Sequence, residues 1–423
     1  MNLIEELQWR GMIRDIMPGT AEQLNKEMAT AYIGFDPTAE SLHIGSLVPI
    51  LLLVHLQKAG HKPIALVGGA TGLIGDPSGK KEERKLLTED EVSHNVEAIR
   101  KQLSRFLDFN SAKNPALLVN NLDWFKGIST IAFLRDAGKY LTVSYLLSKG
   151  FIKDRLARDQ EISFTEFNYI LMQAYDFMWL YQEHNCKIQM GGSDQWGNIT
   201  AGTELIRKKL RGEAFGFTCP LITKADGTKF GKSEQGNIWL DINKTSAFDF
   251  YQFWIRSTDA DAENWIRIFT FLSQEEINSI FKEHKKDAGK RILQKRLAEE
   301  VTKFVHGENA LAEAITSTEK IFTNQSAPAE SISVEDLEVM DCVKIDFTKN
   351  QITNGIDVVS FLTEAGIFDS KGNARKNVQG GGVSINRRKV ENVQMMVNSS
   401  LLLHNKYILI QKGKKNYYLI QAV

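Results

Sequence analysis

The chain has 423 residues, of which 43% are hydrophobic and 25% are charged, as in an ordinary soluble globular protein with two or three domains. The 52 lysines and arginines balance 52 aspartates and glutamates. This balance argues against a protein that is one large nucleic-acid-binding surface, and it leaves room for a local basic module.

The three cysteines, Cys186, Cys219 and Cys342, are far apart and have no CxxC spacing. The pattern therefore indicates neither a disulfide framework nor a zinc site. Glu5 and Glu6 stand where a secretion signal needs a basic start, and no apolar run reaches membrane-spanning length. We expect a cytoplasmic protein with no membrane partner and no metal ligands of its own.

Residues 2–30 predict two short helices, with Thr20 as the cap of the second because Glu22 and Gln23 fall in its first turn. An apolar run up to Ile33 follows and leads into the stretch on which we base our interpretation of the whole chain.

That stretch, GFDPTAESLHIGS, runs from Gly34 to Ser46 and is followed by a helical pattern. The order is strand, turn and helix. Backbone N–H groups and a helix N-terminus then lie beside Thr38 and His43, which suits the phosphates of a nucleotide. From this stretch alone, a histidine that merely packs at a helix start is an equally good interpretation.

Three further apolar runs, at 62–67, 116–120 and 186–190, predict buried strands with helical patterns between them. Strands that alternate with helices indicate a parallel sheet with helices on both faces, which is a Rossmann-like α/β fold. Ligands bind such sheets at the carboxyl ends of the strands.

The loop after the strand at 62–67 has glycines at 69, 72 and 75. This GxxGxxG spacing disfavours a GxGxxG dinucleotide site, and the lysines after Gly79 miss the P-loop pattern by one residue. A second near-match, from Gly227 to Ser233, is also one residue short. Without a family resemblance, we would interpret the first loop as a glycine turn beside a solvated basic helix.

A capping box at Ser163 predicts a helix that is apolar almost all round and therefore buried. Three hydrogen-bonding groups nevertheless stand in one line along it, at i, i+4 and i+7: Tyr169, Gln173 and Asp176. Buried polar groups need partners. A ligand with a hydroxyl and an ammonium group would satisfy this line, and the alternative is an internal network closed by Gln189, Gln195 or water.

From Thr245 the pattern becomes helical, with a second capping box at Ser273. Lysines and arginines between 285 and 296 form either a solvated face or a contact for RNA. Residues 351–423 carry ten Lys/Arg against four Asp/Glu, beside glycines and aromatic residues. That combination suits RNA phosphates and bases.

GFDPTAESLHIGS and KFGKS, at 229–233, together resemble the two ATP-binding signatures of class I aminoacyl-tRNA synthetases. With GSDQWGN at 192–198 between them, nearly the whole chain is similar to the bacterial tyrosyl-tRNA synthetase family. The resemblance implies ligation of L-tyrosine to tRNA(Tyr) through tyrosyl-adenylate, with release of pyrophosphate, and then transfer to the terminal ribose of the tRNA. ATP would be a substrate that brings Mg²⁺, with no tightly bound cofactor.

The resemblance also assigns roles to individual residues. The tyrosine-binding set is Tyr32, Asp76, Tyr169, Gln173, Asp176 and Gln195, with Tyr32 and Asp176 at the phenol hydroxyl. The ATP-binding set is Gly34, Asp36, His43, Ser46, Gly192, Asp194 and Lys232. The catalytic set, which meets the charge on the phosphates, is Thr38, His43, Lys80, Arg84, Lys229, Lys232 and Ser233. Phenylalanine would leave Tyr32 and Asp176 unpaired, which explains selectivity for tyrosine.

Two residues depart from the family pattern. The first signature usually ends in a second histidine, where this chain has Ser46, and a hydroxyl still bonds a ribose oxygen. Ile33 occupies a position where many relatives have a thiol, and it donates nothing.

The implied organisation has four parts. These are a Rossmann-like catalytic domain at 1–225 with an insertion around 123–160, a signature loop and helical anticodon-arm-binding domain at 226–322, a linker at 323–350, and a small α+β RNA-binding domain at 351–423. The insertion is rich in large apolar residues, which either pack on the chain's own core or, as the resemblance implies, form a homodimer interface.

Three other functions compete with this one. A tryptophanyl-tRNA synthetase has a similar catalytic fold, but Tyr32, Asp176 and the basic C-terminal segment favour tyrosine. A nicotinamide oxidoreductase requires a different glycine spacing. An RNA-binding protein without catalysis would have no use for the filled catalytic positions.

Overall fold

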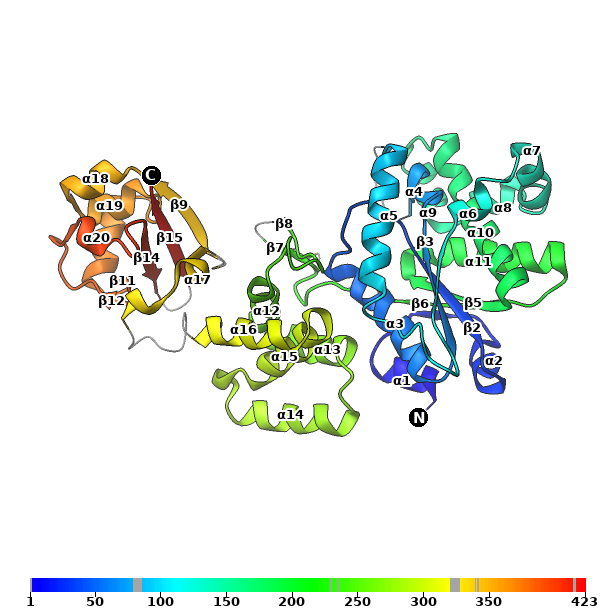
Figure 1. Ribbon diagram of the computed structural model, residues 1–423, viewed down its shortest axis with the longest axis horizontal. Helices are drawn as coiled ribbons and strands as arrows, with labels where there is room; N and C mark the ends of the chain where they lie inside the picture. Colours follow the sequence, from blue (N-terminus) through cyan, green and yellow to red (C-terminus); the bar gives the residue numbers. More distant parts are fainter. Residues whose placement is uncertain are drawn as a thin grey trace. The chain divides into compact units, whose positions relative to one another are not determined.

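The computed structural model describes residues 2–78, 86–228, 230–233, 236–319, 328–338, 340, 342–413 and 416–423. Within them the chain forms two compact units. One unit comprises Met1–Thr245 and Trp254–Val301, and the other comprises Ser246–Phe253 and Thr302–Val423. Figure 1 follows the elements from the N-terminus in blue to the C-terminus in red.

A six-stranded sheet in the order β1-β6-β5-β2-β3-β4 forms the centre of the first unit. Its strands are β1 (Asp15–Ile16), β2 (Thr30–Phe35), β3 (Lys62–Val67), β4 (Leu117–Asn120), β5 (Cys186–Gly192) and β6 (Phe215–Cys219). All neighbours are parallel except β1, which is antiparallel to β6. The predicted parallel sheet is confirmed. Two strands of this sheet, β1 and β6, are not among the predicted ones, and the two residues of β1 are too few to show a periodicity.

Helices flank this sheet, with α3 and α5 against β3 and with α10 and α11 against β5 (Figure 1). The longer helices of this unit are α3 (Leu47–Lys58), α5 (Glu89–Leu103), α10 (Phe164–His184), α11 (Trp196–Leu205), α13 (Asp259–Phe269) and α14 (Gln274–Lys286). The shorter helices are α1 (Leu3–Trp9), α2 (Thr20–Lys26), α4 (Thr71–Ile74), α6 (Leu122–Phe125), α7 (Thr130–Phe133), α8 (Val143–Leu147) and α9 (Gly150–Ala157). Helices α12 (Ala247–Ile255) and α15 (Ile292–His306) each belong partly to both units.

The predicted capping boxes at Ser163 and Ser273 are confirmed at the starts of α10 and α14. The predicted cap at Thr20 is wrong. Gly19 is the N-cap of α2, and its φ of 86° is a conformation that glycine adopts without strain. The Thr20 hydroxyl instead donates to the carbonyl oxygen of Met17 at 2.7 Å, so it stabilises the preceding turn.

Arg10 joins the N-terminal helix to the segment between α13 and α14. Its guanidinium donates to the carbonyl oxygens of Arg267, Thr270 and Leu272 at 2.7–2.8 Å, and its side chain is 3% exposed. Replacing Arg10 with methionine should lower the free energy of unfolding by about 3–5 kcal/mol, because buried acceptors lose charged donors. Chemical denaturation measures this change.

The control for Arg10 is Arg14→Met, which removes a 61% exposed guanidinium. An exposed pair contributes little, so that change should stay within about 0.5 kcal/mol. Equal effects of the two substitutions would contradict the structural role of Arg10.

The second unit contains a five-stranded sheet in the order β12-β11-β14-β15-β9. Its strands are β9 (Val343–Phe347), β11 (Val383–Ile385), β12 (Arg388–Lys389), β14 (Tyr407–Lys412) and β15 (Asn416–Ala422), and a separate pair consists of β10 (Ile356–Asp357) and β13 (Met396–Val397). Its helices include α16 (Glu308–Thr318), α17 (Val334–Glu338), α18 (Lys349–Asn354), α19 (Val358–Glu364) and α20 (Lys371–Gln379). The predicted strands around 383–385 and 407–410 are confirmed.

The sheet of the second unit begins earlier in the chain than residue 351. Strand β9 pairs in parallel with β15, so residues 343–347 of the predicted linker belong to this sheet. Phe347 and Ile345 contribute to the core of this unit, which explains why the strand is ordered there. The lysines at 414 and 415 lie outside the described residues.

Candidate active site

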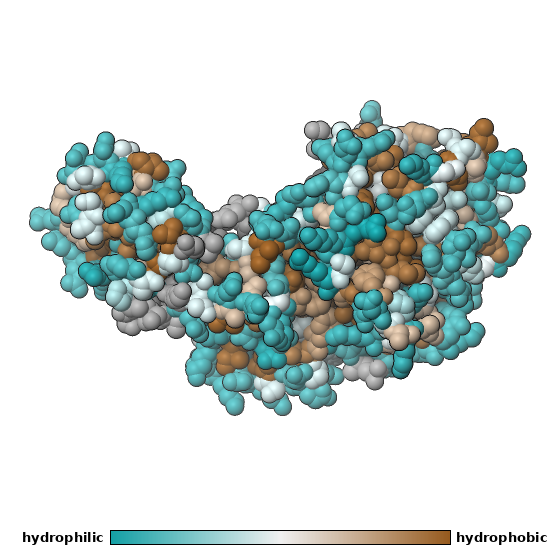
Figure 2. All heavy atoms as spheres, viewed as in Figure 1, coloured by the Kyte–Doolittle hydropathy of each residue, from teal (hydrophilic) through white to brown (hydrophobic). Residues whose placement is uncertain are grey.

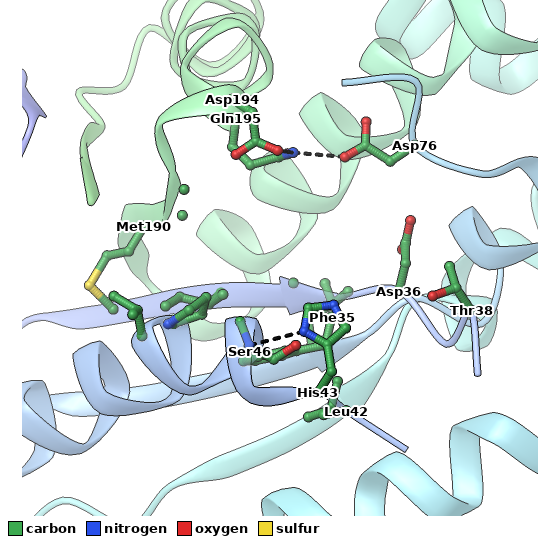
Figure 3. Close-up of a pocket in the computed structure, with 18 of the residues that line it drawn as sticks. Phe35, Asp36, Thr38, Leu42, His43, Ser46, Asp76, Met190, Asp194 and Gln195 are labelled. Carbon is green, nitrogen blue, oxygen red and sulfur yellow. Dashed lines mark hydrogen bonds between the residues drawn. The ribbon is translucent and has the colours of Figure 1, made fainter. Parts of the chain in front are cut away.

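A pocket of about 570 Å³ opens at the carboxyl ends of β2 and β5. Residues from the ends of both strands and from the turn after β2 line it. Figure 3 shows Asp76, Asp194 and Gln195 along one side, with His43 and Ser46 along the other. The position agrees with the rule that parallel sheets bind ligands at the carboxyl ends of their strands.

Asp36 fixes the turn that follows β2. Its carboxylate accepts from the Thr71 hydroxyl and from the Tyr169 hydroxyl, each at 2.8 Å. A Cβ atom at Gly68 would lie 2.2 Å from the Asp36 carboxylate, so glycine is required there for close approach. Asp36 thus connects the first signature to α10.

His43 caps the 3₁₀ helix η1 (Ile44–Ser46) at the entrance to α3. The Gly45 backbone N–H donates to Nδ1 of His43 at 3.0 Å, which leaves the proton of the neutral ring on Nε2. A Cβ atom at Gly45 would lie 2.7 Å from Cε1 of the ring. His43 is therefore oriented as a hydrogen-bond donor by a neighbour that has to be glycine.

The first signature also pairs with residues that follow the second. Backbone bonds join Ile44 N to Ile238 O at 2.8 Å and Leu240 N to Leu42 O at 2.9 Å. The backbone of residues 232–233 forms β7 (Lys232–Ser233), which pairs with β8 (Gly236–Asn237). The side chains of Lys232 and Ser233 lie outside the described part of the chain, as do the predicted residues Lys80, Arg84 and Lys229.

Asp176 lines the pocket and is 2% exposed. It accepts from Nε1 of Trp124 at 2.8 Å and from Nδ2 of Asn121 at 3.1 Å. Burial raises the pKa of Asp176 to about 8, although these two hydrogen bonds favour the charged form. Tyr32 is 1% exposed, and its hydroxyl has no partner among the described residues.

These contacts correct the expectation that Asp176 depends on a ligand, Gln189, Gln195 or water for its partners. The donors are Trp124 on α6 and Asn121 beside it, neither of which is among the predicted site residues. One feature of the sequence could have indicated Asn121: it directly follows the predicted strand at 116–120. That strand, β4, ends at the same sheet edge as β2 and β3, where the pocket lies. Among the described residues that line the pocket, two buried atoms have no hydrogen-bond partner: the hydroxyl of Tyr32 and Oε1 of Gln189.

The opposite end of the tyrosine-binding set forms a network of amides and carboxylates. Nε2 of Gln195 donates to Asp76 at 2.7 Å, and Nε2 of Gln173 donates to Oε1 of Gln195 at 3.2 Å. Burial, and then the negative charge of Asp36, raise the pKa of Asp76 to about 6. A cation would replace the lost solvation of this carboxylate.

This pKa predicts a pH dependence of tyrosine binding. If the ammonium group of tyrosine pairs with ionised Asp76, this interaction should be fully present above about pH 6, and the affinity should fall by about tenfold per pH unit below it. Equilibrium dialysis with labelled tyrosine between pH 5 and 7 measures this. The Asp76→Asn variant should bind weakly and lose the acidic slope, and an unchanged slope in that variant would contradict the assignment.

Gly192 and Asp194 lie together at the end of β5. A Cβ atom at Gly192 would lie 2.5 Å from Oδ1 of Asp194, so this backbone approaches the carboxylate closely. Gly34 and Ser46 line the same pocket from β2 and η1. The structure therefore brings together every predicted site residue whose side chain it describes.

Among the described residues, no group of three or more His, Cys, Asp or Glu side chains is arranged to hold a metal ion. None of the described helices combines the length and apolar character needed to cross a membrane.

Comparison with known proteins identifies the class. Residues 24–323 match the family model described as tRNA synthetases class I (W and Y), and residues 339–420 match that of the Tyrosine–tRNA ligase SYY-like C-terminal domain. The chain therefore belongs to the class I tRNA synthetases.

Comparison with individual relatives identifies the family within this class. The chain is 54% identical to the Tyrosine–tRNA ligase of Parabacteroides distasonis, over 100% of both chains, and 54% identical to that of Cytophaga hutchinsonii, over 99% of both. The truncated mitochondrial tyrosyl-tRNA synthetase of Aspergillus nidulans matches 76% of this chain and 94% of its own, with a TM-score of 0.69 and 29% identity. The chain belongs to the tyrosine–tRNA ligase family, whose reaction is the ATP-dependent attachment of L-tyrosine to tRNA(Tyr).

Proposed function

We propose that the pocket at the ends of β2 and β5 binds tyrosine and ATP together and forms tyrosyl-adenylate. The observation that carries this proposal is the buried Tyr32 hydroxyl, which has no partner among the described residues and lies near the carboxylate of Asp176. A phenol hydroxyl placed there donates to Asp176 and accepts from Tyr32. An unpaired buried hydroxyl costs about 1–3 kcal/mol, and this cost is offset when the substrate binds.

The amino end of tyrosine then lies between Tyr169, Gln173 and Asp76. Asp76 supplies the negative charge for the ammonium group. Gln195 directs its Nε2 group toward the same end of the pocket, where it donates to the reacting carboxylate as well as to Asp76. In this arrangement the substrate carboxylate, rather than a side chain, is the nucleophile.

The carboxylate oxygen of tyrosine attacks the α-phosphorus of ATP, a P–O bond forms, and the bond to pyrophosphate breaks. No general base is needed, because the nucleophile is already ionised. Catalysis consists of positioning and of stabilising the charge that grows on the phosphates. The groups that do so are Thr38 and His43, with Lys80, Arg84, Lys229, Lys232 and Ser233 from the loops.

ATP is held by Gly34, Asp36, His43, Ser46, Gly192, Asp194 and Lys232 in this proposal. Asp194 accepts from the ribose hydroxyls, and glycine at position 192 leaves room for its carboxylate, because a Cβ atom there would lie 2.5 Å from Oδ1. Mg²⁺ arrives with ATP and neutralises phosphate charge.

We also propose that the chain acts as a homodimer in the cytoplasm. Large apolar side chains of the insertion and its flanks are exposed: Ile131 at 72%, Val143 at 62%, Leu156 at 50% and Phe164 at 79%. Figure 2 shows hydrophobic surface over α7, at the upper right. Surfaces of this kind favour a second copy of the chain.

Sedimentation of the Phe164→Asp variant tests the dimer. A charge at this apolar position should shift the protein from dimer to monomer, whereas Leu221→Asp, at another exposed apolar residue, should not. If both variants sediment like the unchanged protein, the proposed dimer interface at Phe164 is contradicted.

Two further segments of the chain contact the tRNA in this proposal. We propose that the helical segment at 226–322 contacts the anticodon arm. Residues 351–423, with their excess of cations, bind RNA as well.

Amino-acid-dependent exchange of labelled pyrophosphate into ATP, without tRNA, tests the chemistry. We expect exchange with tyrosine alone among the twenty amino acids. Exchange with tryptophan would contradict the pocket assignment, and no exchange by folded protein with Mg²⁺ would contradict adenylate formation.

A further inference from the structure

Asn198 is a completely buried amide in the first turn of α11, behind the amino end of the tyrosine pocket. Its Nδ2 group donates to Oε1 of Gln195 at 3.0 Å and to Oε1 of Gln173 at 3.0 Å. It also donates to the Ser78 hydroxyl at 3.2 Å. One side chain therefore contacts three segments of the site: the turn after β5, helix α10 and the loop after α4.

The carboxylate of Asp76 sets the direction of these hydrogen bonds. An ionised carboxylate only accepts, so Gln195 has to present its Nε2 group to Asp76. Oε1 of Gln195 then faces away from Asp76, and every group around that oxygen has to be a donor. Asn198 and Gln173 are those donors.

Asn198 has a second property that packing does not explain. Its Oδ1 atom is buried and has no partner among the described residues. An unsatisfied buried acceptor costs about 1–3 kcal/mol, so a smaller or apolar side chain would serve a purely structural role at lower cost. The amide is useful here because its NH₂ group faces two glutamine oxygens at once.

We propose that Asn198 is a positioning residue, which fixes the orientation of the Gln195 and Gln173 amides toward tyrosine. This inference rests on the tyrosine site proposed above. With Asn198 in place, Nε2 of Gln195 points toward Asp76 and the substrate carboxylate. If Asn198 were an acceptor, both glutamine amides would have to turn their NH₂ groups toward it, and Oε1 of Gln195 would face the carboxylates.

The test is the Asn198→Asp variant, which keeps the size of the side chain and replaces the donor with an acceptor. In pyrophosphate exchange we expect the KM for tyrosine to rise at least about tenfold and kcat to fall, because donors to the substrate are lost. The KM for ATP should change by less than about threefold. Exchange by the unchanged protein tests the proposed function itself, so the proposed function and the role of Asn198 can fail separately.

The matched control is Asn114→Asp. Asn114 is also buried, and its Nδ2 group donates to the carbonyl oxygens of Gln57 and His61 at 2.8 and 2.9 Å. It does not line the pocket. This variant should lose stability in the same way, but its KM for tyrosine should stay unchanged.

Binding of tyramine, which has the amino group and phenol but no carboxylate, separates positioning from simple damage. The Asn198→Asp substitution should reduce the preference for tyrosine over tyramine, because the Gln195 donor to the carboxylate is lost. If Asn198→Asp does not fold, Asn198→Ala should show a smaller loss of the same preference. A preference equal to that of the unchanged protein, in whichever variant folds, would overturn the proposal.

Discussion

Replacing Asp176 with alanine is expected to weaken tyrosine binding by at least about a hundredfold. The substitution removes the proposed acceptor for the phenol hydroxyl and leaves the donors of Trp124 and Asn121 without the Asp176 carboxylate. Each buried donor that loses its acceptor costs about 1–3 kcal/mol. Isothermal titration of the variant with tyrosine measures the loss.

Selectivity should change together with affinity in the Asp176→Ala variant. Phenylalanine has no hydroxyl to lose, so the ratio of tyrosine to phenylalanine affinity should fall by most of the same factor. Asp123→Ala is the control, because Asp123 is exposed on α6 and does not line the pocket. Unchanged tyrosine binding in the Asp176 variant would refute the orientation of the substrate proposed here.

Replacing His43 with alanine is expected to slow tyrosyl-adenylate formation by about 10²–10³-fold, as is typical when a positioned donor to a developing negative charge is removed. The Gly45 N–H group leaves the ring proton on Nε2, and in the proposed mechanism this N–H group donates a hydrogen bond to phosphate in the transition state. Tyrosine affinity should stay within about twofold, because His43 is on the opposite side of the pocket from Gln195 (Figure 3). Single-turnover measurements give both quantities.

A second substitution separates the presence of His43 from its orientation. Gly45→Ala would place a methyl group 2.7 Å from the ring and force the ring to move. It should therefore slow the same step while His43 is retained. His94→Ala is the control, since His94 is an exposed imidazole on α5 that does not line the pocket. Equal rates in the His43 and His94 variants would refute the catalytic role.

Patterns within a short stretch of sequence predict much of this fold. The capping box at Ser163 and the apolar body after it predict α10, and the spacing of Tyr169, Gln173 and Asp176 predicts that they share one side of that helix. Strand β3 has the predicted limits, because a continuous apolar run flanked by turn residues is a local signal. The Rossmann-like class follows from the alternation of such runs with helices.

The sequence alone does not predict contacts between distant segments. Trp124 and Asn121 reach Asp176 because β4 lies next to β3 in the sheet, and no local pattern specifies that neighbour. No local pattern indicates the contacts of Asn198 either, because in the sequence it is only one more polar residue after GSDQWG. Thr20 shows a different error, in which a local pattern predicts a contact that does not form. A residue type that favours the N-cap position can instead donate to the turn before the helix.

The position of β2 in the sheet has a consequence for synthesis of the protein on the ribosome. β2 pairs on one side with β3, but its other partner, β5, follows about 150 residues later, which at roughly 5–20 residues per second is a delay of about 8–30 s. Until then the apolar strand TAYIGF has one unpaired edge, which is a template for aggregation. The nascent chain is thus expected to need a chaperone during this interval, before β5 and Gln195 can complete the tyrosine pocket.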